Sequence, residues 1–320
     1  MASATGTFNY INPIAAPPSP KECLKIGFGV GTPDLVDELL VGKQKKVRNG
    51  RESRFLLQED GFEMLSNIKR PFQHPSELDN LRARYYKARS LCLPLAVDMA
   101  KKRFGADPFY AHFLPPYYRK APLSISKGKV GSSVVDTREH SSGSTPHAVV
   151  HSDFGFGYKE QMLHDADPDT FLNYRDPQKA RALHSKFERA GRMVILQFWM
   201  SAQTDGTVIE NDFLALCHPR SIKTSDLVSR NQTVYNGYKI NYSVLHAKDS
   251  PSHEWFYWPF MKTNECLVWV GYDSAWGDQM TPCFHSSFRD ENTFPEKHRP
   301  RESLECRVML LLDEKVRSRL

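Results

Sequence analysis

The second half of the chain is a series of short apolar runs separated by turn residues. Each run is rich in aromatic or β-branched residues, a composition typical of strands. Many short strands after a helix-rich first third predict a double-sheet jelly roll supported by helices. We therefore expect a mostly β fold with flanking helices and a double-stranded β-helix (jelly-roll, cupin-like) core. The expected strands are residues 193–200, 213–217, 233–245, 255–259 and 266–272.

Two helices are expected around this strand-rich part. The first covers about residues 77–104, and Pro94 within it is expected to kink or break the helix. The second covers residues 177–190 and begins after Asp176, a residue type that caps helix N-termini. Residues 120–146 are rich in Ser, Gly, Lys and Thr, so they form the most loop-like stretch of the chain.

At 320 residues, the chain is long enough to bury a sizeable core. Residues 1–20 are rich in Ala, Ser, Pro and Thr, and we expect them to form a flexible N-terminal arm. Residues 21–320 are expected to form a single catalytic jelly-roll domain with an α-rich N-terminal third. The 6 cysteines include no C-x-x-C pair, which predicts reduced, buried thiols in an intracellular protein rather than a disulfide framework or a zinc site.

The net charge of +6 is mild, and the basic residues are scattered, so no nucleic-acid-binding face is expected. No stretch of about twenty apolar residues is present, so no membrane span is expected. The chain ends in Ser318-Arg319-Leu320, a conservative variant of the Ser-Lys-Leu peroxisomal address. We expect a cytoplasmic protein, with the peroxisome as the alternative location.

Three residues far apart in the sequence form a candidate metal site: His151, Asp153 and His285. Two imidazoles and one carboxylate are the ligands that hold a non-heme Fe(II) on one face and leave the opposite face open. Residues two apart on a strand point the same way, so His151 and Asp153 can reach one metal. For each histidine alone, an ordinary hydrogen-bonded role is the alternative; the order of the elements favours the metal site.

An R-x-S element, Arg301 and Ser303, follows the last histidine. A guanidinium binds a carboxylate through a two-pronged, charge-assisted pair, so Arg301, helped by Ser303, is the candidate anchor for a 2-oxo acid. Arg307 is the alternative anchor, because it lies on the same face of the strand expected at residues 303–312. That face also carries Glu305, and buried charge needs a partner. The alternative is an edge strand with a solvated polar face.

The order H-x-D, H and R-x-S resembles the signature of Fe(II)/2-oxoglutarate-dependent oxygenases. More narrowly, the chain resembles the fungal and bacterial hydroxylase/desaturase family typified by gibberellin desaturase and the small chain of the cephalosporin 7-alpha-methoxylase. The matching stretches run in order from about residue 47 to 312. They are LQEDGF from Leu57, VHSD from Val150, DLV from Asp226, HEWFY from His253, YDS from Tyr272, HSSFRD from His285 and PRESLECR from Pro300.

The resemblance implies an enzyme that uses Fe(II), 2-oxoglutarate and O2 to hydroxylate, desaturate or cyclise a small secondary metabolite. It places the metal on His151, Asp153 and His285, and the 2-oxoglutarate carboxylate on Arg301. One departure is present: where the family has N-V-W-R-P, this chain has Gln197 in place of the asparagine and Met200 in place of the arginine. This departure puts the polar contacts near the substrate in doubt.

Two other functions are consistent with parts of the pattern. A metal-dependent hydrolase explains the three candidate ligands but gives Arg301 and Ser303 no task. An accessory subunit, as the methoxylase small chain suggests, would not need an intact set of ligands. Trp199 and the aromatic stretch from Trp255 to Trp258 are candidates for a pocket wall, with a core role as the alternative.

Overall fold

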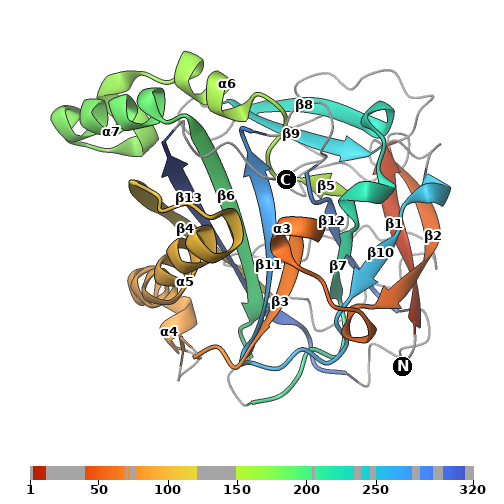
Figure 1. Cartoon of the computed structure of the whole chain (residues 1–320). Coiled ribbons are helices and arrows are strands. Elements are labelled where there is room, and N and C mark those ends of the chain that lie inside the picture. Colours follow the sequence, from red (N-terminus) through yellow and green to blue (C-terminus); the bar gives the residue numbers. More distant parts are fainter. Residues whose placement is uncertain are drawn as a thin grey trace.

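The computed structural model describes residues 3–11, 40–69, 71–72, 76–120, 149–203, 206–233, 239–245, 250–275, 282–290 and 298–313. Two sheets face each other, and helices cover the outer side of one of them (Figure 1). The eight-stranded sheet has the order β1-β2-β10-β7-β12-β5-β9-β8, and the five-stranded sheet has the order β3-β11-β6-β13-β4. This architecture is the expected mostly β jelly roll with flanking helices.

Most of the expected strand ranges match an observed strand within a few residues. The range 233–245 does not, because it joins the end of β8 to β9, two strands that pair antiparallel. The strands are β1 Ser3–Ile11, β2 Leu40–Asn49, β3 Phe62–Ser66, β4 Tyr110–Lys120, β5 His151–Ser152, β6 Arg192–Ser201, β7 Phe213–Cys217, β8 Leu227–Thr233, β9 Lys239–Leu245, β10 Trp255–Tyr257, β11 Glu265–Asp273, β12 His285–Phe288 and β13 Glu302–Leu312. The α-helices are α3 Leu57–Asp60, α4 Ser76–Asp79, α5 Leu81–Phe104, α6 Tyr158–Asp165 and α7 Pro177–Arg189. Short 3-10 helices cover Gly50–Glu52, Pro168–Asn173, Pro219–Ser221, Thr224–Asp226 and Ser250–Ser252.

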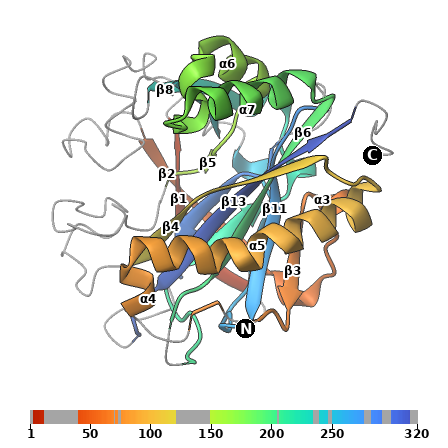
Figure 2. The same cartoon turned by 90° about the vertical axis from the view of Figure 1, so that its left-hand side faces the viewer.

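The five-stranded sheet has an apolar outer face and an inner face that mixes apolar and polar side chains. Helix α5 lies across the apolar, outer face (Figure 2). It packs there against alternate residues of β13, which confirms the predicted apolar face: Leu304, Cys306, Val308 and Leu310. The other alternate residues of β13 point to the inner face, toward the eight-stranded sheet. Two charged residues of this strand, Glu305 and Arg307, therefore lie between the two sheets.

Helix α5 differs from the sequence prediction at its start and in its middle. It begins after Asn80, whose side chain accepts a hydrogen bond from the Ala83 N–H at 3.0 Å, and α4 is a separate turn. The helix is not broken at Pro94 and continues to Phe104. Pro94 lies on the exposed side, where freed carbonyl groups can turn toward water. The buried side, which includes Ala88 and Cys92, stays packed on the sheet.

Helix α7 begins where the sequence predicted. The Asp176 side chain accepts hydrogen bonds from the N–H groups of Gln178 at 3.0 Å and Lys179 at 3.3 Å. These bonds satisfy two donors that a helix N-terminus leaves unpaired. Leu183 and Phe187 of this helix are buried in a hydrophobic cluster between α7 and one end of the strands β6 and β13.

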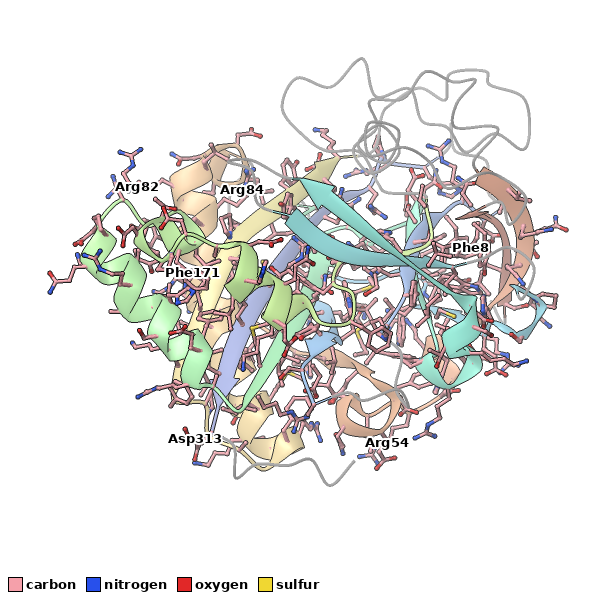
Figure 3. The ribbon with its side chains drawn as sticks, turned by 90° about the horizontal axis from the view of Figure 1, so that it is seen from above. Phe8, Arg54, Arg82, Arg84, Phe171 and Asp313 are labelled. Atoms are coloured by element: carbon pink, nitrogen blue, oxygen red, sulfur yellow. The ribbon has the colours of Figure 1, made fainter. Side chains whose placement is uncertain are left out.

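The expectation of a flexible arm over residues 1–20 is wrong for Ser3–Ile11, which form strand β1. This strand pairs antiparallel with β2, and the side chains of Phe8 and Tyr10 are fully buried. Phe8 stacks on Trp255 at a centroid distance of 4.4 Å. Figure 3 labels Phe8 in the interior and, for comparison, the exposed Arg82 of α5. The alternation of inward residues along β1 anchors the segment, despite its small and polar composition.

Several expectations lie wholly or partly outside the described residues. These are the loop-like stretch from residue 121 to 146, the end Ser318-Arg319-Leu320, and residues 12–20 of the expected arm. The five cysteines that the structure describes are buried free thiols, as predicted. Among the described helices, none is long and apolar enough to cross a membrane.

Candidate active site

The structure brings His151, Asp153 and His285 together between the two sheets. His151 in β5 and His285 in β12 are direct partners in an antiparallel pair, so their rings lie on the same side with centroids 4.3 Å apart. Asp153 follows β5, and one ligand atom from each residue lies within 4.8 Å of the others. The pairing of β5 with β12 thus closes the long gap in sequence between the two histidines.

Hydrogen bonds to the backbone orient both imidazoles. The Nδ1 atom of His151 lies 2.7 Å from the Val149 carbonyl oxygen, and Nδ1 of His285 lies 3.5 Å from that of Cys283. A ring whose Nδ1–H donates to a carbonyl presents its unprotonated Nε2 on the other side. Burial and the neighbouring His151 lower the pKa of His285 to about 3, which keeps this imidazole neutral.

The two oxygens of the Asp153 carboxylate have different surroundings. Oδ1 lies 3.5 Å from the His151 Nε2 atom, facing the imidazoles. Oδ2 accepts hydrogen bonds from Gln197 Nε2 at 2.5 Å, from Arg307 Nε at 3.0 Å and from Arg307 Nη2 at 2.6 Å. Burial alone would raise the pKa of this carboxyl, but the Arg307 guanidinium and the two histidines hold it well below its usual range.

Arg307, the alternative anchor for a 2-oxo acid, is therefore engaged elsewhere. Besides Asp153, its Nη2 atom donates to Glu305, and its guanidinium lies over the Tyr117 ring at 4.8 Å. Glu305 in turn forms an ion pair with Arg119 at 3.4 Å. These residues form a continuous chain of charge pairs along the inner face of the five-stranded sheet, which gives the inward charges the partners they need.

Arg301 and Ser303 lie on the same inner face, and both are buried. Arg301 Nη1 donates to the Asp212 carbonyl and to Ser287 Oγ at 3.2 Å, and its guanidinium lies 5.4 Å from the Trp199 ring centroid. The buried Arg301 Nε and Ser303 Oγ atoms have no hydrogen-bond partner. Burial lowers the pKa of Arg301 to about 10, so the guanidinium stays charged at neutral pH. A buried cation beside two unsatisfied polar atoms is a site for an anion.

A cavity joins this guanidinium to the two imidazoles. Its lining residues are Arg119, His151, Trp199, Leu214, Trp269, His285, Ser287, Arg301 and Glu305. A small molecule in the cavity could therefore contact both the imidazoles and Arg301. We call this space the anion cavity.

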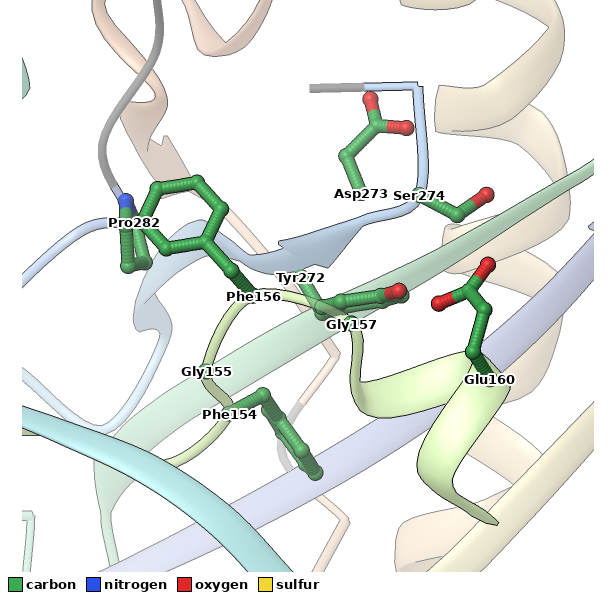
Figure 4. Close-up of a pocket in the computed structure, with 9 residues that line it drawn as sticks. All are labelled: Phe154, Gly155, Phe156, Gly157, Glu160, Tyr272, Asp273, Ser274 and Pro282. Carbon is green, nitrogen blue, oxygen red and sulfur yellow. The ribbon is translucent and has the colours of Figure 1, made fainter. Parts of the chain in front are cut away.

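A second cavity adjoins the segment that follows Asp153 (Figure 4). Its lining is aromatic or apolar on one side and polar on the other: Phe154, Gly155, Phe156, Gly157, Tyr272 and Pro282, with Glu160, Asp273 and Ser274. Along the inner face of β11, Tyr272 lies one inward position beyond Trp269 of the anion cavity, across a β-bulge. The two cavities therefore lie at successive levels of the same sheet.

The structure shows which of the candidate aromatic residues, and which of the two departures from the family pattern, lie at the site. Trp199 lines the anion cavity, whereas the stretch from Trp255 to Trp258 is buried core and lines neither cavity described here. Met200 packs on the outer face beneath α5, away from the site. Gln197 lies on the inner face and contacts Asp153, so only this departure reaches the candidate metal ligands.

The sequence analysis did not predict that four residues would make contacts in the site: Arg119, Gln197, Trp269 and Glu305. Glu305 was recognised as an inward charge without a named partner. Arg119 and Trp269 lie on strands β4 and β11, and only the sheet register places them beside β13 and β6. No local motif marks either residue.

Comparison with known proteins agrees with this architecture. A sequence profile described as the Oxidoreductase/YMDC permease-like domain matches residues 37–311. A variant of the iron and alpha-ketoglutarate-dependent endoperoxidase NvfI has a TM-score of 0.64 and 16% identity, over 97% of this chain and 98% of that chain. NvfI itself has a TM-score of 0.62 and 16% identity, over 98% and 99%. No curated protein matches the chain.

At such low identity, the likeness to NvfI establishes the jelly-roll fold alone. The profile match is independent of that likeness and extends over most of the chain, from before β2 to the end of β13. The chain belongs to the Oxidoreductase/YMDC permease-like domain family.

Proposed function

We propose that this protein is a non-heme Fe(II)/2-oxoglutarate-dependent oxygenase that oxidises a small organic molecule. The observation that carries the proposal is the anion cavity, which is lined both by two imidazoles and by a buried, incompletely paired Arg301. A metal chelated by the ketoacid end of 2-oxoglutarate and a guanidinium on its far carboxylate require this arrangement. The family description and the fold shared with NvfI support the same reaction class.

The metal would be held by Nε2 of His151, Nε2 of His285 and Oδ1 of Asp153. This donor set suits Fe(II), because it leaves positions open on one side of the metal. Bound iron, together with 2-oxoglutarate and O2, supplies the oxidising power for breaking a carbon–hydrogen bond. The protein's residues orient the reactants and exclude water, and the backbone carbonyls at the Nδ1 atoms of both imidazoles turn their Nε2 atoms toward the metal.

The charges of the site favour a dianion. Four guanidinium groups, those of Arg119, Arg289, Arg301 and Arg307, face three carboxylates, those of Asp153, Asp212 and Glu305. One positive charge is therefore uncompensated, and a divalent metal adds two more. Because opposite charges attract strongly away from water, the metal and 2-oxoglutarate should bind cooperatively. Arg301 and Ser303 would bind the far carboxylate.

The organic substrate would bind in the second cavity. Its aromatic and apolar wall suits a hydrocarbon-rich small molecule, and the carboxylates of Glu160 and Asp273 are candidates for contacts with substrate hydroxyl or amine groups. A secondary metabolite such as a terpenoid, polyketide or amino-acid derivative fits this chemistry. Hydroxylation, desaturation and ring closure all begin with removal of a substrate hydrogen and are open as outcomes.

A metal-dependent hydrolase would use the same three ligands but would leave the unsatisfied Arg301 without a task. An accessory subunit would need neither the ligands nor the anion cavity. The anion cavity therefore favours the oxygenase over both.

The test is succinate formation by the purified full-length chain supplied with Fe(II), ascorbate, 2-oxoglutarate and air. Slow turnover of 2-oxoglutarate without an organic substrate suffices, so the substrate need not be known. We expect succinate only when iron, 2-oxoglutarate and oxygen are all present, and none from the Arg301→Met variant at low 2-oxoglutarate. Arg82→Met, on the exposed surface of α5, is the matched control. Absence of succinate from the metal-loaded wild type would refute the proposal.

A further inference from the structure

Three neighbouring strands present Trp269, Gln197 and Arg307 side by side on the inner face. The register pairs Gln197 of β6 with Trp269 of β11 on one side and with Arg307 of β13 on the other. Gln197 is fully buried in this row. Its side chain therefore has no water to bond with and depends on its neighbours.

Trp269 determines which way the Gln197 amide points. The indole Nε1–H donates to Gln197 Oε1 at 2.9 Å. An indole N–H can only donate, so the partner atom must be the carbonyl oxygen of the amide. The amide NH2 group consequently points the other way, where it lies 2.5 Å from Asp153 Oδ2 and 3.5 Å from Glu305 Oε1.

The backbone of β11 leaves room for this long side chain. A Cβ atom at Gly271 would lie 2.1 Å from Gln197 Oε1, a distance at which one of the two must move. Gly271 also lies where the register of β11 against β6 shifts. The bulge and the missing side chain together accommodate a glutamine where a shorter residue would need no such space.

Arg307 approaches the same carboxylate oxygen from the other side. Its Nε and Nη2 atoms lie 3.0 Å and 2.6 Å from Asp153 Oδ2. Oδ2 thus accepts three N–H groups from two side chains, of which Gln197 is fully buried and Arg307 is 11% exposed. An oxygen so occupied cannot turn to a cation without losing these bonds, whereas Oδ1 faces the imidazoles.

We propose that Gln197 and Arg307 are positioning residues that hold Asp153 as a single-oxygen metal ligand, an inference that rests on the metal site of the proposed function. Two imidazoles and one oxygen occupy three positions of a six-coordinate metal. Both oxygens of Asp153 would occupy a fourth and leave too few positions for a chelating 2-oxo acid and a further reactant. The hydrogen bonds to Oδ2 would therefore keep the remaining coordination positions of the metal free.

The length of Gln197 gives a mild and specific perturbation. Asparagine, the residue of the resembled family at this position, is shorter by one carbon–carbon bond, about 1.5 Å. The Gln197→Asn side chain cannot hold both the Trp269 indole and Asp153, so one N–H to Oδ2 is lost. Arg307→Lys keeps the charge but replaces two donors on one oxygen by a single point charge. Gln178→Asn, on the exposed face of α7, is the matched control.

The experiment loads the full-length variants with Co(II) under anaerobic conditions. It records the visible absorption spectrum, which reports the ligand geometry, and measures the Co(II) dissociation constant. We expect Gln197→Asn and Arg307→Lys each to weaken Co(II) binding about 10- to 100-fold, the usual effect of removing a partner of a metal ligand. We also expect both to change the spectrum at saturating metal, whereas Gln178→Asn matches the wild type. General loss of structure would weaken binding but would not produce a new spectrum in a fully loaded protein.

The outcomes separate this inference from the proposed function. If the wild type binds no Co(II), or if His285→Ala binds it equally well, the metal site itself is refuted. If the wild type binds Co(II) and His285→Ala does not, but both positioning variants keep the wild-type affinity and spectrum, only the role of Gln197 and Arg307 is refuted. If one variant fails to fold, the other decides the question alone.

Discussion

Replacing Arg301 with methionine should weaken 2-oxoglutarate binding by about 100-fold while leaving metal binding within about threefold. Methionine fills much of the arginine volume over Trp199 but cannot donate a hydrogen bond. The Arg301 side chain contacts Asp212, Ser287 and Trp199 and none of the three metal ligands, so the ligands keep their partners. The substitution should therefore weaken anion binding without affecting the metal ligands.

The expected magnitude follows from the burial of the charge. Burial lowers the pKa of Arg301 from 12.5 to about 10. At about 1.4 kcal/mol per pH unit, this difference corresponds to about 3 kcal/mol by which the empty protein disfavours the charged guanidinium. A bound carboxylate removes most of this penalty, and 3 kcal/mol is about a 100-fold change in affinity. Loss of one partner of a buried charge pair costs about 2–5 kcal/mol, a similar size.

The assay is anaerobic calorimetric titration of 2-oxoglutarate into protein saturated with Mn(II). Ser303→Ala removes one hydrogen bond from a hydroxyl to the carboxylate, about 1.5 kcal/mol, and should weaken binding about tenfold. Arg301→Lys should fall between the two, because it restores the charge without the forked geometry. Equal affinities of Arg301→Met and the wild type would show that 2-oxoglutarate is anchored elsewhere and would refute the assignment.

Three further predictions concern other parts of the molecule. Asp153→Asn should abolish detectable metal binding with little loss of stability, because the amide oxygen can still accept hydrogen bonds from Arg307 and Gln197. Asp153→Ala should also unfold more easily, because it leaves these enclosed donors without their acceptor. Chelator-controlled metal titration measures the binding and thermal melts measure the stability, and equal melting temperatures of the two variants would contradict the reasoning. Phe8→Ala should lower the free energy of unfolding by about 3–5 kcal/mol, since the ring is buried between Trp255 and Phe288; a denaturant-measured change below about 1 kcal/mol would mean that β1 is not part of the core. Burial alone would raise the pKa of the Asp226 carboxyl, but hydrogen bonds from the Lys223 N–H and His253 lower it. The ionised carboxylate therefore stabilises the fold above about pH 4, and this stabilisation is lost as the pH falls through the lowered pKa. Asp226→Asn should therefore be less stable than the wild type at pH 7, with the gap closing on acidification, and a gap independent of pH would contradict this assignment.

Most of the site could be predicted because it depends on short local spacing. The two-residue spacing of His151 and Asp153 and the alternation along β13 both follow from strand geometry, and the structure places these residues as the spacing implied. The inward charges of β13 were recognised because a buried charge needs a partner.

The partners themselves could not be predicted, because they come from strands far apart in sequence. Arg307 and Asp153 are 154 positions apart, and only the facing of the two sheets brings them together. The same limit explains β1: its composition predicted an arm, but its pairing with β2 and its contacts with Trp255 make it part of the core. The helix is not broken at Pro94 because the packing of α5 on the sheet outweighs the local preference for a break.

The central claim, a metal site that creates a 2-oxoglutarate site, is tested most directly by anaerobic titration of Fe(II) in the presence and absence of 2-oxoglutarate. We expect one Fe(II) per chain, bound at least tenfold more tightly with 2-oxoglutarate present, and no binding by the His285→Ala variant. If Fe(II) affinity is unchanged by 2-oxoglutarate, or if His285→Ala binds iron as the wild type does, the account is contradicted.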